Sequence, residues 1–152
     1  MLRVTEVSFY HLQRSPLEQA LPKLLGRTLK AGKRAIVKAN SLERIEALNS
    51  VLWTYDPASW LPHGAAKDGY GSEQPVWLTD GDDNPNGATF LFLTDGAESD
   101  RLADFDRCFD LFDGNDAGAL SAARNRWKIC KGAGHTLRYW QETEIGGWEE
   151  KA

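Results

Sequence analysis

The chain has 152 residues, of which 41% are hydrophobic, and this length and composition allow one domain with a buried core and exclude a chain that is disordered throughout. Its formal net charge of −4 argues against nucleic-acid binding through the overall electrostatic field. No segment has the apolar length of a signal peptide or a membrane span, so we expect a soluble, cytoplasmic protein.

The first third of the chain begins with a predicted strand and helix. Weak alternation of apolar residues predicts a strand over Val4–Tyr10. Ser15, Pro16 and Glu18 have the pattern of an N-cap, a first-turn proline and a capping-box acid, and they predict that a helix begins there. Gly32 is expected to end that helix.

A second strand and helix follow. Ala35–Val37 is predicted to be a short buried strand, and Ser41 is expected to cap a helix with apolar residues at helical spacing up to residue 52. The aromatic- and proline-rich stretch Trp53–Gly64 predicts a loop. This loop either covers the core as a lid or presents an apolar patch to a partner.

The remaining elements continue the alternation of strands and helices. Strands are predicted over Val76–Leu78 and Thr89–Leu93, joined by a solvated hairpin turn at Asp80–Gly87. Apolar residues at helical spacing predict a helix over Arg101–Phe112, and a last strand is expected around Leu137–Trp140. The sequence therefore predicts an α/β fold whose mostly parallel sheet is covered by helices on both faces.

The domain organisation follows from the absence of internal repeats and of any domain-sized linker. We expect one α/β domain over residues 1–141, followed by an acidic C-terminal tail over residues 142–152. Two interpretations of the tail remain open. It is either a frayed, solubilising end or a segment that occupies a basic site of its own chain.

The stretch Leu120–Gln141 differs in charge from everything around it. It contains five basic residues and no acidic one: Arg124, Arg126, Lys128, Lys131 and Arg138. At about 100° per residue, Arg124, Lys128 and Lys131 share a stripe roughly 60° wide, and Trp127 borders it. Cationic donors beside an aromatic ring suit a short acidic peptide with an apolar end. The alternative is a solvated basic face with Trp127 in the core.

Motifs for catalysis, nucleotides or metals are weak or missing. No Gly-x-Gly-x-x-Gly or phosphate-loop pattern follows a predicted strand. Asp80–Asn84 has the ligand spacing of a calcium loop, but Pro85 stands where that loop needs its turn glycine. Cys108 and Cys130 lack metal-ligand spacing and are expected to be core thiols. We therefore expect no cofactor and no metal, and a catalyst is the weaker functional class.

Seven short motifs occur in a recognisable order. They are Gly32-Lys33-Arg34, Leu52-Trp53, Pro62-His63-Gly64, Gln74-Pro75-Val76, Asp110-Leu111-Phe112-Asp113, Ala123-Arg124-Asn125-Arg126-Trp127-Lys128 and Gly134-His135. From about Ser8 to Gln141 this order resembles the chi subunit family of bacterial DNA polymerase III. The resemblance implies a non-catalytic accessory protein of the clamp-loader complex, with a Rossmann-like three-layer fold that has lost nucleotide binding.

The resemblance also implies a binding site on the penultimate helix. Members of this family bind the acidic, phenylalanine-ended C-terminal tail of single-stranded DNA-binding protein through a basic and aromatic surface. The matching positions here are Arg124, Trp127, Lys128, Lys131 and Gly134. Contact with nucleic acid is then mainly indirect. The alternative is direct single-strand binding, with Trp127, Tyr139 and Trp140 stacking on bases.

A second surface is implied by the same resemblance. Family members bind the psi subunit, which links chi to the clamp loader, through an aromatic loop. The matching residues here are Trp53, Trp60, Pro62 and His63. This loop could instead bind another clamp-loader protein or only close the core. The resemblance offers no role for the tail.

Overall fold

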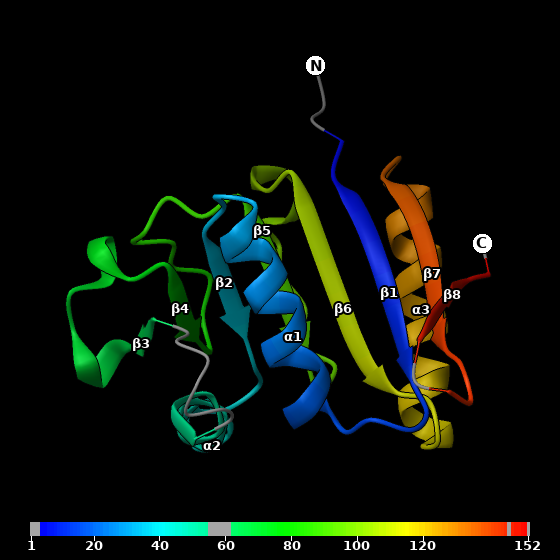
Figure 1. Ribbon diagram of the computed structural model, residues 1–152. Coiled ribbons are helices and arrows are strands. Elements are labelled where there is room, and N and C mark those ends of the chain that lie inside the picture. Colours follow the sequence, from blue (N-terminus) through cyan, green and yellow to red (C-terminus); the bar gives the residue numbers. More distant parts are fainter. Residues whose placement is uncertain (1–3, 55–61, 146, 152) are drawn as a thin grey trace.

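A computed structural model describes residues 4–54, 62–145 and 147–151 (Figure 1). Its framework is one eight-stranded sheet with the order β3-β4-β2-β5-β6-β1-β7-β8. All neighbouring strands are parallel except β7 and β8, which are antiparallel. The strands are β1 (Glu6–Leu12), β2 (Ala35–Lys38), β3 (His63–Ala65), β4 (Val76–Thr79), β5 (Phe90–Thr94), β6 (Arg107–Asp113), β7 (Thr136–Glu142) and β8 (Trp148–Glu150).

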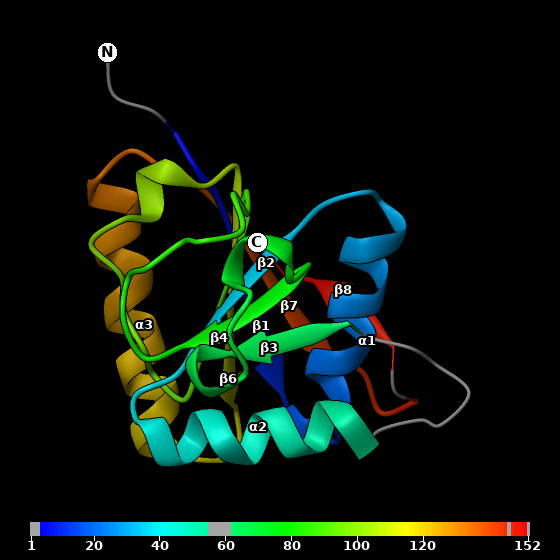
Figure 2. The same cartoon turned by 90° about the vertical axis from the view of Figure 1, so that its left-hand side faces the viewer.

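Helices cover both faces of this sheet (Figures 1 and 2). Helices α1 (Leu17–Lys30) and α2 (Leu42–Thr54) pack on one face, and α3 (Ala117–Gly132) packs on the other. Three short 3-10 helices, η1 (Ala66–Asp68), η2 (Gly71–Glu73) and η3 (Leu102–Asp104), lie in the connections. The predicted α/β fold with a mostly parallel sheet flanked by helices is confirmed. Within the described ranges, no helix is long and apolar enough to cross a bilayer.

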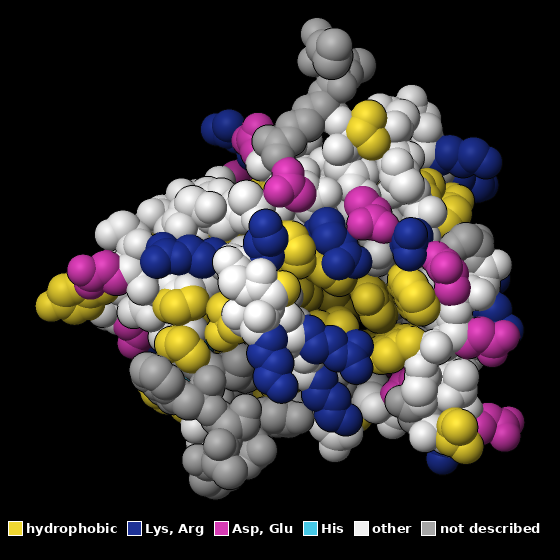
Figure 3. Space-filling model, turned by 45° about the horizontal axis from the view of Figure 1, so that its top comes forward, with side chains coloured by type: hydrophobic (Ala, Val, Ile, Leu, Met, Phe, Trp, Pro, Cys, Tyr) yellow, Lys and Arg dark blue, Asp and Glu magenta, His cyan; other side chains and the backbone are white. Residues whose placement is uncertain are grey.

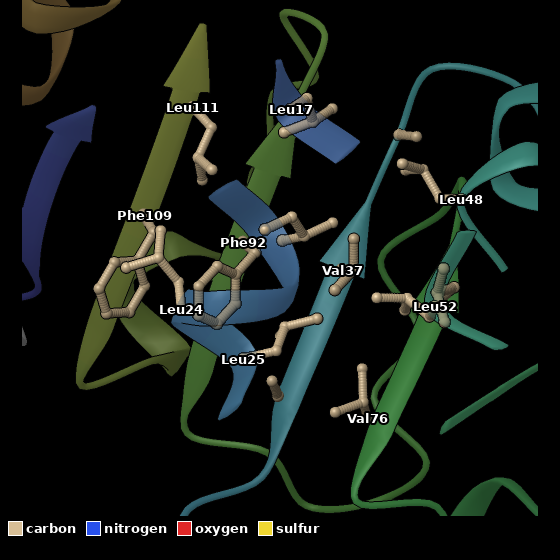
Figure 4. Packing of buried hydrophobic residues seen from close by; sticks show 14 of the residues in the cluster. Leu17, Leu24, Leu25, Val37, Leu48, Leu52, Val76, Phe92, Phe109 and Leu111 are labelled. Atoms are coloured by element: carbon tan, nitrogen blue, oxygen red, sulfur yellow. The ribbon is translucent and has the colours of Figure 1, made fainter. Parts of the chain in front are cut away.

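The core on the α1 side shows why these residues form these elements (Figure 4). Leu24 and Leu25 of α1 point at the sheet, where they meet Val37 of β2 and the stacked rings of Phe92 and Phe109. Those two rings have centroids 4.4 Å apart and an interplanar angle of 6°. Burying each such side chain contributes about 1.5–3 kcal/mol, so this layer fixes α1 on the centre of the sheet.

The helix predicted over Arg101–Phe112 is wrong, because only η3 and then strand β6 occupy that segment. Strand β6 lies in the middle of a sheet covered on both faces, and residues 108–112 are all buried. A strand of this kind needs no alternation of apolar and polar residues. The helix-like spacing of Phe105, Cys108, Phe109 and Phe112 arises by coincidence. Cys108 and Cys130 are nevertheless buried free thiols, as predicted.

Two predicted connections also differ from the structure. The segment Asp80–Gly87 is not a hairpin turn, because β4 and β5 do not pair with each other and each is a parallel neighbour of β2. The predicted loop Trp53–Gly64 is shorter than expected, since α2 continues through Thr54 and β3 begins at His63. Residues 55–61 of that loop lie outside the described residues. The other predicted strands and helices are confirmed.

The predicted capping box does not form at the start of α1, and the turn before this helix is instead held from the far end of the chain. The helix begins after Pro16, and no side chain next to it caps its first turn. Instead Glu142, the last residue of β7, accepts N–H groups from Gln13, Arg14 and Ser15 at 3.1, 2.8 and 2.8 Å. Its other carboxylate oxygen accepts the Ser15 hydroxyl at 2.5 Å. Glu142 therefore joins the β1–α1 turn to the end of β7.

The tail beyond Glu142 is not a frayed end in its described residues. Residues 148–150 form β8, which pairs with β7 in the register Glu142↔Trp148 and Trp140↔Glu150. The ring of Trp148 meets Tyr10 edge-on on the α1 side of the sheet, at a centroid distance of 5.0 Å. The described tail therefore lies on the opposite side from α3 and does not cover the basic helix.

Glu142 makes the stability of the protein depend on pH. Burial alone would raise the pKa of Glu142, but the Ser15 hydroxyl and the three N–H groups outweigh burial and hold that pKa below its ordinary value. A carboxyl whose pKa is lowered by folding stabilises the folded state fully above its unfolded pKa of about 4.3. This stabilisation is lost as the pH falls through the lower, folded pKa.

We predict that Glu142→Gln lowers the free energy of unfolding at pH 7 by about 1–3 kcal/mol, because a neutral amide oxygen replaces a carboxylate that accepts buried donors. Urea unfolding followed by circular dichroism measures this loss. The difference between the variant and the unmodified protein should shrink as the pH falls below about 4. Glu144→Gln changes an exposed carboxylate of the same tail and is the matched control. Equal losses in both variants would contradict the role of Glu142.

Candidate functional site: the outer face of helix α3

Helix α3 carries most of the basic stretch, and local interactions fix both of its ends. The Asp116 carboxylate accepts the N–H groups of Gly118 and Ala119 at 2.9 and 3.2 Å, which is an N-cap. At the other end Gly134 has φ +85°, in the left-handed region that favours glycine. Gly134 therefore ends α3 and turns the chain into β7, which gives this predicted site residue a structural role.

Arg126 points into the protein, away from the other cations of the helix. Its Nε and one terminal nitrogen donate to the two oxygens of Asp110 on β6, at 2.7 and 3.0 Å. The side chains of Arg126 and Asp110 are only 8% and 3% exposed. Burial raises the pKa of the Asp110 carboxyl, and the Arg126 guanidinium opposes that rise. Arg126 is thus the residue that fixes α3 to the sheet.

Arg138 also leaves the basic face of α3. Residues alternate between the two faces of a strand, and Arg138 lies on the same side of β7 as Trp140, which packs in the α1-side core. Its Nε lies 2.8 Å from a carboxylate oxygen of Glu6 and 3.7 Å from one of Glu150. Of the five basic residues of the sequence stretch, Arg126 is therefore buried in an ion pair and Arg138 lies on the opposite face of the sheet. The other three remain on the outer face of α3.

The three remaining cations form the stripe that helical spacing predicts. Arg124, Lys128 and Lys131 are all exposed on α3. Within the part of the chain that the structure describes, no carboxylate lies at ion-pair distance from any of them. In a protein of net charge −4, this outer face of α3 is a local excess of positive charge.

Trp127 lies at the border between this stripe and the core. Its ring centroid is 5.4 Å from that of Phe9 and 5.9 Å from that of Tyr139, and the side chain is half-buried. One part of the indole thus packs on β1 and β7, while the rest stays accessible beside the cations. This arrangement agrees with the border position expected from the sequence. It provides a rigid aromatic surface next to three donors.

The structure adds His11 and Tyr139 to this region. The Tyr139 hydroxyl and His11 Nδ1 are 2.6 Å apart. Burial lowers the pKa of His11, and the nearby Arg124 guanidinium lowers it further. A Cβ atom at Gly114 would lie 1.8 Å from the His11 ring, so the loop after β6 needs glycine there. The sequence pattern gave His11 no role, because only the tertiary structure brings it near this site: the pairing of β1 with β7 places it beside Tyr139, and the packing of α3 on these strands places α3 over it.

The residues of the second predicted surface lie at the other edge of the sheet. The Trp53 side chain is 59% exposed, and its ring centroid is 4.4 Å from that of His63. His63 itself is buried, with Nε2 3.3 Å from the carbonyl oxygen of Asn49, and Pro62 is half-buried. Trp60 lies outside the described residues. Strand β3 and strand β7 are far apart in the sheet order, so this surface is separate from the α3 face.

A cavity of about 700 Å³ lies at the carboxyl ends of β1 and β6, the edge at which α/β proteins commonly bind ligands. One of the two helix N-termini next to this cavity is bound by a carboxylate, because Asp116 accepts N–H groups at the start of α3. At the other, Glu142 accepts the N–H groups of the turn that precedes α1. Such N–H groups are donors that a phosphate could otherwise use. Among the described residues, no cluster of three or more His, Cys, Asp or Glu side chains could hold a metal ion.

Comparisons with known proteins identify the family. The family model described as DNA polymerase III chi subunit, HolC, matches residues 4–138, which include α3 and most of the sheet. The chain is 28% identical over 88 residues to the probable DNA polymerase III subunit chi of Rickettsia prowazekii (strain Madrid E). That alignment covers 58% of this chain and 53% of the relative, so the chain spans about half the length of the curated relative it matches. The chain belongs to the DNA polymerase III chi subunit family.

Proposed function

We propose that this protein is a non-catalytic accessory subunit in DNA replication, and that it connects single-stranded DNA-binding protein to the clamp-loader complex in the cytoplasm. The observation that carries this proposal is the outer face of α3. Three exposed cations there have no carboxylate partner among the described residues, and they border a half-buried tryptophan. The family membership indicates a role in the polymerase III complex.

The proposed ligand is the acidic, phenylalanine-ended C-terminal tail of single-stranded DNA-binding protein. Its carboxylates would pair with Arg124, Lys128 and Lys131, and its terminal ring would pack against Trp127. Hydrogen bonds to charged groups contribute about 1.5–3 kcal/mol each, and arginine can bind a carboxylate in a bidentate manner. Gly134 supports this site indirectly, because it ends α3 just after Lys131.

We predict that Arg124→Ala weakens binding of a labelled tail peptide by about 1.5–3 kcal/mol, or roughly 10- to 150-fold in Kd, in a fluorescence anisotropy titration. Removing the terminal phenylalanine of the peptide should also weaken binding, because Trp127 then loses its apolar contact. Arg101→Ala removes an exposed arginine just before η3 whose ion pair is on the surface, and it serves as the control. Unchanged affinity in the Arg124 variant would contradict this site.

Direct binding of single-stranded nucleic acid is the alternative, and the geometry disfavours the form predicted from the sequence. Trp127 and Tyr139 lie on the α3 side of the sheet, whereas Trp140 lies on the α1 side. One strand cannot stack on all three rings. A titration with bare oligonucleotide at two salt concentrations distinguishes the alternatives, because direct binding would be tight and steeply dependent on salt.

We also propose that the Trp53 surface binds a psi subunit or another protein of the clamp loader. Trp53 is a large, exposed aromatic residue at the end of α2, and Pro62 lies beside the start of β3. His63 is buried against Trp53, so it would hold the indole in place rather than contact the partner. Exposed, rigidly held aromatic rings are common at the centre of protein interfaces.

We predict that Trp53→Ala abolishes co-purification with a psi or clamp-loader protein while it changes the free energy of unfolding by less than about 1 kcal/mol. The small change in the free energy of unfolding is expected because most of the Trp53 side chain is exposed to solvent. Tyr70→Ala is a matched control, because Tyr70 is another highly exposed aromatic residue. A loss of about 3–5 kcal/mol would instead identify Trp53 as a core residue that closes the protein.

A further inference from the structure

The helices on the α1 side of the sheet do not cover its whole width. Helix α1 lies in front of β2, β5 and β6 (Figure 1). Strands β1, β7 and β8 continue the sheet beyond α1, and no helix of the described chain covers them on this side (Figure 1). The space-filling view shows an apolar depression in this region, bordered by several lysine and arginine side chains and, along its upper and right-hand margin, by acidic ones (Figure 3). We call this depression the aromatic hollow.

Five aromatic rings from five strands form one connected cluster on this side of the sheet, which extends from the part under α1 to the uncovered strands; only Trp140 and Trp148 of the five are partly exposed. The five rings are Tyr10 of β1, Phe90 of β5, Phe109 of β6, Trp140 of β7 and Trp148 of β8. Tyr10 meets Trp148 edge-on at 5.0 Å and stacks with Trp140 at 6.3 Å. The rings of Phe90 and Phe109 are 5.8 Å apart. These contacts hold the cluster rigidly, so its exposed part is a preformed apolar surface.

Cations border this cluster. The Arg107 guanidinium lies 5.5 Å from the centroid of Phe90 and 4.7 Å from that of Phe109. Burial raises the pKa of the Tyr10 hydroxyl, and so does the charge of Glu6, whereas the charges of Arg107, Arg27 and Arg138 oppose that rise. Lys23 and Arg27 of α1 line a groove of about 360 Å³ whose other side includes Trp148.

The acidic residues of the same area compensate this charge only in part. Glu6 forms ion pairs with Arg107 at 3.2 Å and with Arg138 at 2.8 Å, and Glu150 lies 3.7 Å from Arg138. Glu142 is already occupied by the β1–α1 turn. In the described structure neither Lys23 nor Arg27 has a carboxylate at ion-pair distance. The aromatic hollow is therefore an apolar surface with an excess of positive charge at its border, in a chain that is acidic overall.

We propose that the aromatic hollow binds an amphipathic helix of a partner protein, with an apolar stripe that faces the partly exposed rings of Trp140 and Trp148 and acidic residues on both flanks. A sheet face next to α1 is the place where a second helix of this fold class would pack. Acidic flanks would meet Lys23 and Arg27 on one side and Arg138 on the other. This mode of recognition places a helix in a groove formed by existing elements.

Other occupants fit less well. A second copy of this chain would bring two positively charged borders together, which is unfavourable. A nucleic-acid strand needs a row of exposed ring faces for stacking, but three of the five rings, Tyr10, Phe90 and Phe109, are at most 9% exposed, which leaves only Trp140 and Trp148 for contact. The hollow also lies on the other side of the sheet from α3. Its Trp148 belongs to β8, beyond residue 138, where the family match ends.

The experiment uses the full chain and a panel of labelled helical peptides with a leucine and phenylalanine stripe. One set has glutamate on both flanks, a second has lysine, and a third has the glutamate set's composition in scrambled order. The glutamate set should bind at least about tenfold more tightly than the other two. Only these peptides combine an apolar stripe for the hollow with acidic flanks for the cations at its border. The indole N–H resonances of Trp140 and Trp148 should shift on binding, while that of Trp127 stays unchanged.

Two surface variants test the location of binding. Arg27→Glu should weaken the glutamate peptides about tenfold or more, whereas Lys67→Glu, an exposed lysine of η1, should not. Arg124→Ala should bind these peptides normally, and Arg27→Glu should bind the tail peptide of single-stranded DNA-binding protein normally, so the two sites are tested independently. The proposal is overturned if no glutamate peptide binds, if the lysine set binds equally well, or if Arg27→Glu has no effect.

Discussion

The buried ion pair between Arg126 and Asp110 determines how α3 presents its surface. The pair joins the middle of the helix to a central strand through two hydrogen bonds and is almost fully buried. A buried ion pair contributes little net stability compared with apolar residues in its place. Removal of only one partner is strongly destabilising, because the other charge is then buried without compensation. The pair therefore restricts the rotation of α3. With Arg126 turned inward, Arg124, Lys128 and Lys131 must point outward, and Trp127 must lie between them and the core.

Carboxylates perform a related task at the carboxyl edge of the sheet. The Asp116 carboxylate accepts backbone N–H groups at the start of α3. The Glu142 carboxylate, at the end of β7, accepts those of the turn before α1. Both act where nucleotide-binding α/β proteins hold a phosphate. This fold thus uses its helix ends for internal connections, and its exposed chemistry lies on the outer faces. The α3 stripe, the Trp53 edge and the aromatic hollow occupy three separate parts of the surface.

Local patterns predicted much of this molecule, and long-range contacts explain what they missed. The spacing of Arg124, Lys128 and Lys131 predicted the stripe, since it depends only on helical geometry. The partner of Arg126 could not be predicted, because Asp110 belongs to β6 and the uniform burial of that strand imitates a helix. The capping box at Ser15 satisfied every local rule, yet Glu142 binds the same turn from 127 residues away. The aromatic hollow depends on the strand order, which no local pattern contains.

The central claim is that the outward stripe of α3, formed by Arg124, Lys128 and Lys131, binds the peptide and that the inward-facing Arg126 does not. The double variant Asp110→Leu with Arg126→Met replaces the ion pair by apolar side chains of similar size, which can keep α3 packed on β6 and are often neutral for stability. The most direct measurement is the affinity of this folded double variant for the tail peptide of single-stranded DNA-binding protein, alongside its free energy of unfolding. We expect the free energy of unfolding to stay within about 1–2 kcal/mol of the unmodified protein and the Kd to stay within about threefold. A stable double variant whose affinity falls tenfold or more would contradict the claim and make Arg126 part of the binding site.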